Sequence, residues 1–172
     1  MSAADSPLTS THPDSTPPDS AIRLSFRPTT MLISSTRRFA GDVLGSVLRD
    51  PDSASRIALT IHELLENTLK YSLDGQALLE VSVGNEQGGR RRVEVTARNR
   101  ATPEQANDLG RRIHALSQAN DPMALYVGMM RESAQRSGSG LGLARIRVEG
   151  EMDLSCALEG DAVIVSAWTA AE

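Results

Sequence analysis

The feature that most constrains this chain is one amphipathic stretch, residues 57–72, which reads IALTIHELLENTLKYS. At about 100° per residue, a helix would bring Glu63, Asn67 and Lys70 within one arc of about 60°. Apolar side chains occupy the opposite side of that helix: Ile57, Ala58, Ile61, Leu64, Leu65 and Leu69. We therefore predict a helix that packs one face against a core and presents a carboxylate, an amide and an ammonium group together on the other.

These three polar side chains suit phosphate chemistry. The carboxylate of Glu63 can accept a proton from a water or hydroxyl, and the amide oxygen of Asn67 can bind Mg²⁺. The ammonium group of Lys70 can meet a phosphate. The alternative is an ordinary solvated helix face, because polar residues at these spacings are common on helix surfaces.

Composition narrows the class of protein. The length of 172 residues suggests one domain, and with only 3% aromatic residues the core must come from Leu, Ile, Val and Ala. The net charge of −4 argues against a general nucleic-acid binder. A single cysteine, Cys156, excludes an intramolecular disulfide and fits a reducing compartment. Because the sequence has neither a long apolar run nor a signal-peptide pattern, we expect a cytoplasmic protein without a membrane span.

The pattern along the chain predicts a tail and one α/β domain. Residues 1–20 hold four prolines and no cation, so we expect a disordered tail before a domain of residues 21–172. Alternation of apolar residues predicts strands at 21–28, 77–85, 92–99, 152–159 and 162–169. Helices are predicted at 29–48, with Thr29 or Thr30 as the N-cap, and at 53–72, where Ser53 is the N-cap candidate after a turn at 50–52. Further helices are predicted at 103–119 and at 122–136, the second capped by Asn120-Asp121, with a short one ending at 149. The expected fold is an α/β two-layer sandwich, with a mixed, mostly antiparallel sheet and helices on one face.

A second motif, SGSGLGL at residues 137–143, predicts a glycine-rich loop that opens a helix. Its glycines alternate along the chain: Gly138, Gly140 and Gly142. Such a loop lets backbone N–H groups face an anion, and the helix that follows adds its positive end. A dinucleotide fingerprint would follow a strand, and a P-loop would contain Gly-Lys-Ser/Thr. A flexible linker is the alternative, but Leu141 and Leu143 alternate with the glycines and can anchor the loop to a core.

Together the two motifs resemble those of the GHKL superfamily of ATP-binding domains, which includes gyrase, Hsp90, histidine kinases and MutL. HELLENTLKYS is similar to the N box of this superfamily, and SGSGLGLARI is similar to its second glycine box. Within the superfamily, Glu63 four residues before Asn67 resembles the bacterial anti-sigma-factor serine/threonine kinases. The resemblance covers residues 20–170 and implies the Bergerat ATP-binding fold.

The resemblance also implies roles for individual residues, with ATP and Mg²⁺ as ligands. Glu63 would be the catalytic base and Asn67 the residue that binds Mg²⁺. The residues around the nucleotide would be Asn67, Lys70, Asn99, Gly138, Gly140, Leu141 and Gly142. The partner would be a small regulatory protein of the anti-sigma-factor antagonist type, whose Ser or Thr receives the γ-phosphate, and a homodimer is compatible with the family.

The chain departs from the superfamily at the first glycine box, Asp-x-Gly-x-Gly. It has Asn99-Arg100-Ala101-Thr102-Pro103 there, so Asn99 stands where an aspartate would read the adenine amino group. An amide oxygen is a weaker acceptor than a carboxylate because it carries no charge. This arrangement resembles the SiaB-type subgroup of partner-switching kinases. Two functions therefore stay open: a kinase, or a GHKL-fold binding module that sequesters a partner with little or no nucleotide binding.

Overall fold

The computed structural model describes residues 20–85, 90–133 and 141–171. The predicted tail lies outside these residues except for Ser20, and so does most of the loop predicted between the second and third strands. The elements in chain order are β1 (Ser20–Phe26), α1 (Thr30–Val47), α2 (Pro51–Tyr71), β2 (Ala77–Asn85), β3 (Arg91–Arg100), α3 (Pro103–Ser117), α4 (Pro122–Ser133), α5 (Leu141–Val148), β4 (Asp153–Glu159) and β5 (Ala162–Ala171).

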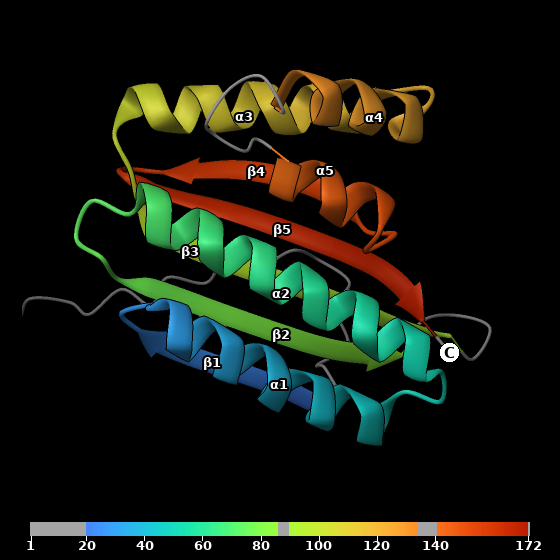
Figure 1. Cartoon of the computed structure of the whole chain (residues 1–172). Coiled ribbons are helices and arrows are strands. Elements are labelled where there is room, and N and C mark those ends of the chain that lie inside the picture. The colour runs from blue at the N-terminus through green and yellow to red at the C-terminus, as the bar shows by residue number, and fades with distance from the viewer. Residues whose placement is uncertain (1–19, 86–89, 134–140, 172) are drawn as a thin grey trace, which may run out of the picture.

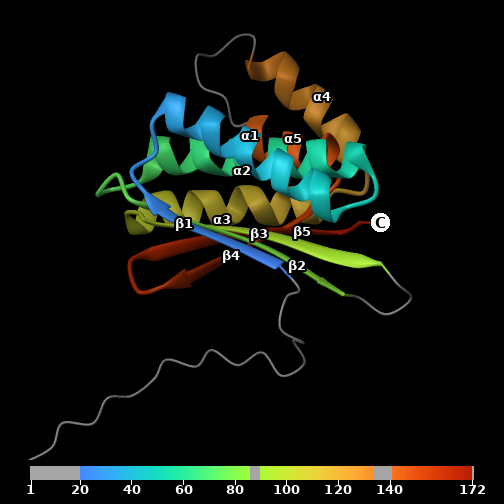
Figure 2. The same cartoon turned by 90° about the horizontal axis from the view of Figure 1, so that it is seen from below.

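The strands form one sheet in the order β1-β2-β3-β5-β4, and the helices cover one of its faces (Figures 1 and 2). α1 and α2 lie side by side over one half of the sheet, and α3 and α5 cover the half formed by β5 and β4 (Figure 1). α4 packs on α5, farther from the sheet (Figure 2). The predicted α/β two-layer sandwich is confirmed. Each pairing between the described strands is antiparallel, so the sheet is not mixed.

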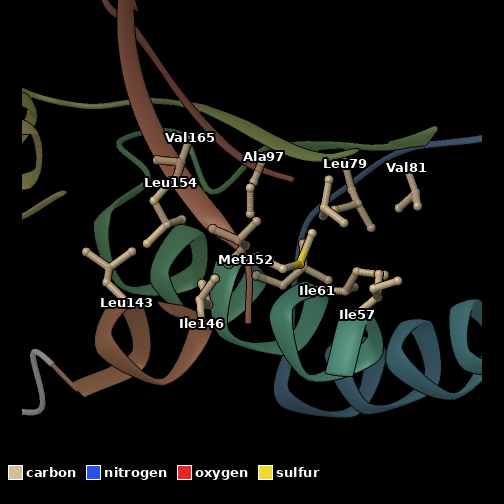
Figure 3. Close-up of a cluster of buried hydrophobic side chains, with 14 of the residues drawn as sticks. Ile57, Ile61, Leu79, Val81, Ala97, Leu143, Ile146, Met152, Leu154 and Val165 are labelled. Atoms are coloured by element: carbon tan, nitrogen blue, oxygen red, sulfur yellow. The ribbon is translucent and has the colours of Figure 1, made fainter. Parts of the chain in front are cut away.

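The core lies between the sheet and the helices. Inward-facing side chains are aligned across the three central strands in two rows, Leu79–Ala97–Val165 and Val81–Val95–Ala167. Ile57 and Ile61 of α2 are almost completely buried opposite these rows. Met152 and Ile146 fill the space beside them (Figure 3). Small aliphatic side chains in register thus form the core that the low aromatic content predicted.

The N-cap of α2 lies three residues earlier than predicted. We expected a turn at 50–52 with Ser53 as the N-cap, which is wrong: Asp50 is the cap and Pro51 is the first helical residue. The Asp50 carboxylate accepts hydrogen bonds from the backbone N–H groups of Asp52 at 3.0 Å and Ser53 at 2.9 Å. Proline suits this position because the first N–H of a helix has no helical partner. Thr29 caps α1 as predicted.

The apolar face of α2 ends before Leu69. We expected Leu69 to join the core, but it is 45% exposed. Thr68 is buried in that turn instead, and its hydroxyl donates to the Leu64 carbonyl at 3.0 Å. A threonine can be buried in a helix because this bond satisfies its hydroxyl.

In the described residues 20–85, 90–133 and 141–171, no helix is both long and apolar enough to cross a bilayer.

Candidate functional site

A cavity of about 310 Å³ opens between α2, α3 and the start of α5, at the ends of β3 and β5. Its walls are formed by Glu63, Glu66, Asn67, Lys70, Tyr71, Asn99, Ala101, Glu104, Gln105, Asp108, Leu109, Arg112, Gly142, Leu143 and Val163. Two segments far apart in the sequence, the polar face of α2 and the first turn of α5, therefore meet at one cavity.

The cavity brings together most of the described residues that the sequence singled out: Glu63, Asn67, Lys70, Asn99 and Gly142. Asn99 is an inward-facing residue of β3, in register with Val163 of β5. Leu141 is the first residue of α5 and does not line the cavity. Gly138 and Gly140 lie outside the described residues.

Glu63 is the most buried charged group of this site. Its side chain is 6% exposed, and its Oε1 accepts a hydrogen bond of 2.5 Å from Nη1 of Arg145. Burial raises the pKa of the Glu63 carboxyl, and the charge of Arg145 opposes this rise without cancelling it. A carboxylate whose pKa is raised toward neutrality suits proton transfer, because it is a stronger base.

Gly142 lies against this carboxylate. A Cβ at Gly142 would be 2.7 Å from Oε2 of Glu63, closer than van der Waals contact allows. The prediction that the loop extends to residue 143 is wrong, because α5 begins at Leu141 and Gly142 is helical. The absence of a side chain at Gly142 therefore makes room for Glu63, which is a different use of glycine from a bend in a phosphate loop.

A hydrogen-bonded network behind Glu63 was missed by sequence reasoning. Arg145 also pairs with Glu149, with Nη2 at 3.1 Å from Oε2. The Tyr126 hydroxyl donates to Oε1 of Glu149 at 2.7 Å. These contacts lower the pKa of Glu149, mainly through the hydrogen bond from Arg145. The signal available in the sequence was the i, i+4 spacing of Arg145 and Glu149 directly after the glycine motif.

The charges in the walls bear on what the cavity can bind. Its acidic side chains are Glu63, Glu66, Glu104 and Asp108, and its basic ones are Lys70 and Arg112. Arg112 is already paired with Asp108, with Nη2 at 2.7 Å from Oδ2. A polyanion such as a triphosphate would therefore need a divalent cation to bind beside these carboxylates.

The donor set suits Mg²⁺ held jointly with a phosphate ligand. Within the described ranges, no three His, Cys, Asp or Glu side chains are grouped so that they could hold a metal by themselves. Mg²⁺ is commonly bound through one or two protein oxygens, waters and the oxygens of substrate phosphates. The amide oxygen of Asn67 is available in the cavity wall for this use. Apolar walls at Ala101, Leu109 and Val163 could receive a flat base.

Comparison with known proteins bears on the fold. No family model and no curated protein matches this sequence. A chain in the crystal structure of the SiaB–SiaC complex from Pseudomonas aeruginosa is similar in structure, with a TM-score of 0.67. The match covers 87% of this chain and 88% of that chain at 19% sequence identity. The likeness shows the fold.

Proposed function

We propose that this chain is an ATP-binding regulatory protein of the GHKL type that acts as a serine/threonine kinase in a partner-switching module. The observation that carries the proposal is the meeting of Glu63, Asn67 and Gly142 at one cavity. These are residues of the two motifs that resemble the GHKL superfamily, and Gly142 is separated from the other two by about half of the domain.

In the proposed reaction, the hydroxyl oxygen of a Ser or Thr forms a bond to the γ-phosphorus of ATP. The bond from that phosphorus to the oxygen bridging the β-phosphate breaks, ADP leaves, and Glu63 accepts the hydroxyl proton. Lys70 would contact the phosphates, and Asn67 would hold Mg²⁺. When bound, Mg²⁺ neutralises charge on the phosphate oxygens.

The partner in this proposal is a small regulatory protein with a phosphorylatable Ser or Thr. The similar solved structure is a complex of two proteins, which supports a protein partner for this chain as well.

A second candidate is a binding module that sequesters its partner and binds nucleotide weakly or not at all. Asn99 favours it, because the family's adenine-reading aspartate is replaced by a neutral amide. The Nδ2 of Asn99 donates to the Arg100 carbonyl at 3.1 Å, which leaves its oxygen to accept a hydrogen bond. That oxygen can still read an amino group, although less strongly than a carboxylate.

Calorimetric titration with ATP and Mg²⁺ tests the proposal. The wild-type chain should bind, and Asn67→Ala should abolish Mg²⁺-dependent binding, because it removes the proposed metal ligand. Asn107→Ala is the matched control, since Asn107 is an exposed asparagine of α3 outside the cavity. Equal ATP affinity in Asn67→Ala and the wild type would contradict the site. If the wild-type chain does not bind ATP, the result favours the second candidate, the sequestering module.

A further inference from the structure

Arg145 occupies a position between Glu63 and the helices behind it. Its Nη1 bonds Glu63 of α2, while Nη2 and Nε contact Glu149 at 3.1 and 3.3 Å. Arg145 itself is absent from the cavity wall. It is therefore placed to influence a bound ligand through Glu63.

We propose that Arg145 is a positioning residue that fixes the Glu63 carboxylate in the cavity and links it to α4 through Glu149 and Tyr126. This inference rests on the proposed function, in which Glu63 is the base. It assigns a role to Arg145, to which neither motif gave one. It also connects Glu63, the proposed base, to α4.

The contacts of Glu63 hold its carboxylate in one orientation. Oε1 of Glu63 is held by Arg145, and Oε2 lies 2.7 Å from the position that a Cβ of Gly142 would take. In the described part of the chain, the bond from Arg145 is the only hydrogen bond to this carboxylate. A buried carboxylate without that bond would lose its partner and turn toward the cavity or toward water.

The network continues to α4 through a buried hydroxyl. Tyr126 is 8% exposed, and its hydroxyl bonds the same Glu149 that holds the guanidinium of Arg145. Arg145 lies on α5 and Glu149 directly follows the last residue of that helix, so the guanidinium is held by Glu63 on one side and by Glu149 on the other. A change in the packing of α4 would thus reach Glu63 through three side chains, two of them charged.

Other charged groups around Glu63 do not replace Arg145. His62 and Glu66 of α2 pair with each other at 3.2 Å, and Arg112 of α3 pairs with Asp108. The remaining charged groups that face the cavity or the network are Lys70, Glu104 and Glu149. Among the described residues, Arg145 is the only cation that forms an ion pair with the Glu63 carboxylate.

The first test measures nucleotide affinity and ADP formation for the full chain with ATP and Mg²⁺. Water takes the place of the partner's hydroxyl in this assay: it attacks the γ-phosphorus and loses its proton to Glu63. Arg145→Met should slow ADP formation by roughly ten- to a hundredfold, because a poorly oriented base loses part of its usual contribution. Its affinity for MgATP should stay within about twofold, because Arg145 does not line the cavity. Arg145→Lys should recover part of the rate, and Tyr126→Phe should lose roughly two- to tenfold.

Arg147→Met is the matched control, since Arg147 lies on the same helix and pairs with Asp153 at 2.8 Å. It should change neither rate nor affinity. An Arg145→Met variant that is as fast as the wild type, or faster, would overturn the proposal. An equal loss of rate in Arg147→Met would also overturn it, because the effect would then be a general one on α5.

A second test needs no nucleotide and therefore separates this inference from the proposed function. The carboxyl carbon of Glu63 is followed by ¹³C NMR over a pH titration of the free protein. Without Arg145 the largest effect that opposes burial is lost, so the pKa of Glu63 should rise in Arg145→Met and stay unchanged in Arg147→Met. Identical titration in Arg145→Met and the wild type would refute the positioning role, whereas absence of ATP binding would refute only the kinase.

Discussion

At the scale of single residues, Glu63 combines opposing electrostatic effects. Burial disfavours its charged form, while Arg145 at 2.5 Å favours it, and burial is the larger effect. The folded state therefore holds this proton more tightly than the unfolded chain does. A carboxyl with a raised pKa contributes stability that is complete below its ordinary value of 4.5 and is lost as pH rises through the folded value.

Glu63→Gln should therefore gain stability relative to the wild type as pH rises from the acidic range to neutrality. The gain is about 1.4 kcal/mol for each unit by which folding raises the pKa of Glu63. Urea unfolding at a series of pH values measures it. Glu149→Gln is the control of opposite sign, because the pKa of Glu149 is lowered and its contribution is lost as pH falls. If the free energy of unfolding, relative to the wild type, changed with pH in the same direction for both variants, the opposite pKa shifts of Glu63 and Glu149 would be contradicted.

Helical spacing was sufficient to group part of the site. Glu63, Asn67 and Lys70 fall on one face because the period of a helix is known, and all three line the cavity. Arg145 could not be found this way, since it is 82 residues from Glu63 in sequence and meets it only after α5 packs on α2. Spacing within an element is local, whereas contacts between elements depend on how the helices pack.

At the scale of elements, two glycines of the same region meet different neighbours. A Cβ at Gly142 would approach the end of the Glu63 side chain, which can move. A Cβ at Gly150 would lie 2.6 Å from the backbone oxygen of Ile146 and 2.7 Å from Oγ1 of Thr60. The backbone oxygen cannot move without distorting the last turn of α5.

Gly142→Ala should therefore fold with little loss of stability, because alanine favours the helix by about 1 kcal/mol and the carboxylate can swing aside. The displaced base should nevertheless slow ADP formation. Gly150→Ala should lose roughly 1–3 kcal/mol from overpacking against fixed atoms. Thermal unfolding and the ADP assay on both variants check this contrast. If both variants lost the same amount of stability, the Glu63 side chain could not move aside, and the proposed contrast with the fixed backbone at Ile146 would be contradicted.

Capping signals predicted some helix ends and missed another. Two hydroxyl residues before an apolar periodic run, Thr29 and Thr30, were the candidates for the cap of α1, and Thr29 is the cap. Asp121 before Pro122 accepts from Ala124 N–H at 2.9 Å, as expected for a cap. The start of α2 was misassigned, because Asp50-Pro51 has the composition of both a turn and a helix start. The choice between them depends on whether the helix continues into a packed core.

At the scale of the whole molecule, the strands could be predicted but not their order. Alternation identified each strand, and the short turn at Gly160 joined β4 to β5. The pairing of β3 with β5 joins strands that are separated in the chain by three helices and β4. It follows from which apolar faces bury each other and not from any local pattern, so the sequence alone left the sheet order and the fully antiparallel pairing undetermined.

The last prediction concerns the stability of the whole domain. A nucleotide that binds only the folded chain, at 100 times its Kd, should stabilise it by about 2.7 kcal/mol. For a domain of this size that corresponds to a rise in Tm of roughly 5–10 °C in a calorimetric scan. Removal of Mg²⁺ with EDTA should eliminate most of the rise, because Glu66 and Glu104 then face an unneutralised triphosphate. If ATP does not change the Tm, either with or without Mg²⁺, the result contradicts the kinase and favours the sequestering module. If the Tm rises equally in EDTA, nucleotide binding is supported but the proposed role of Mg²⁺ in it is contradicted.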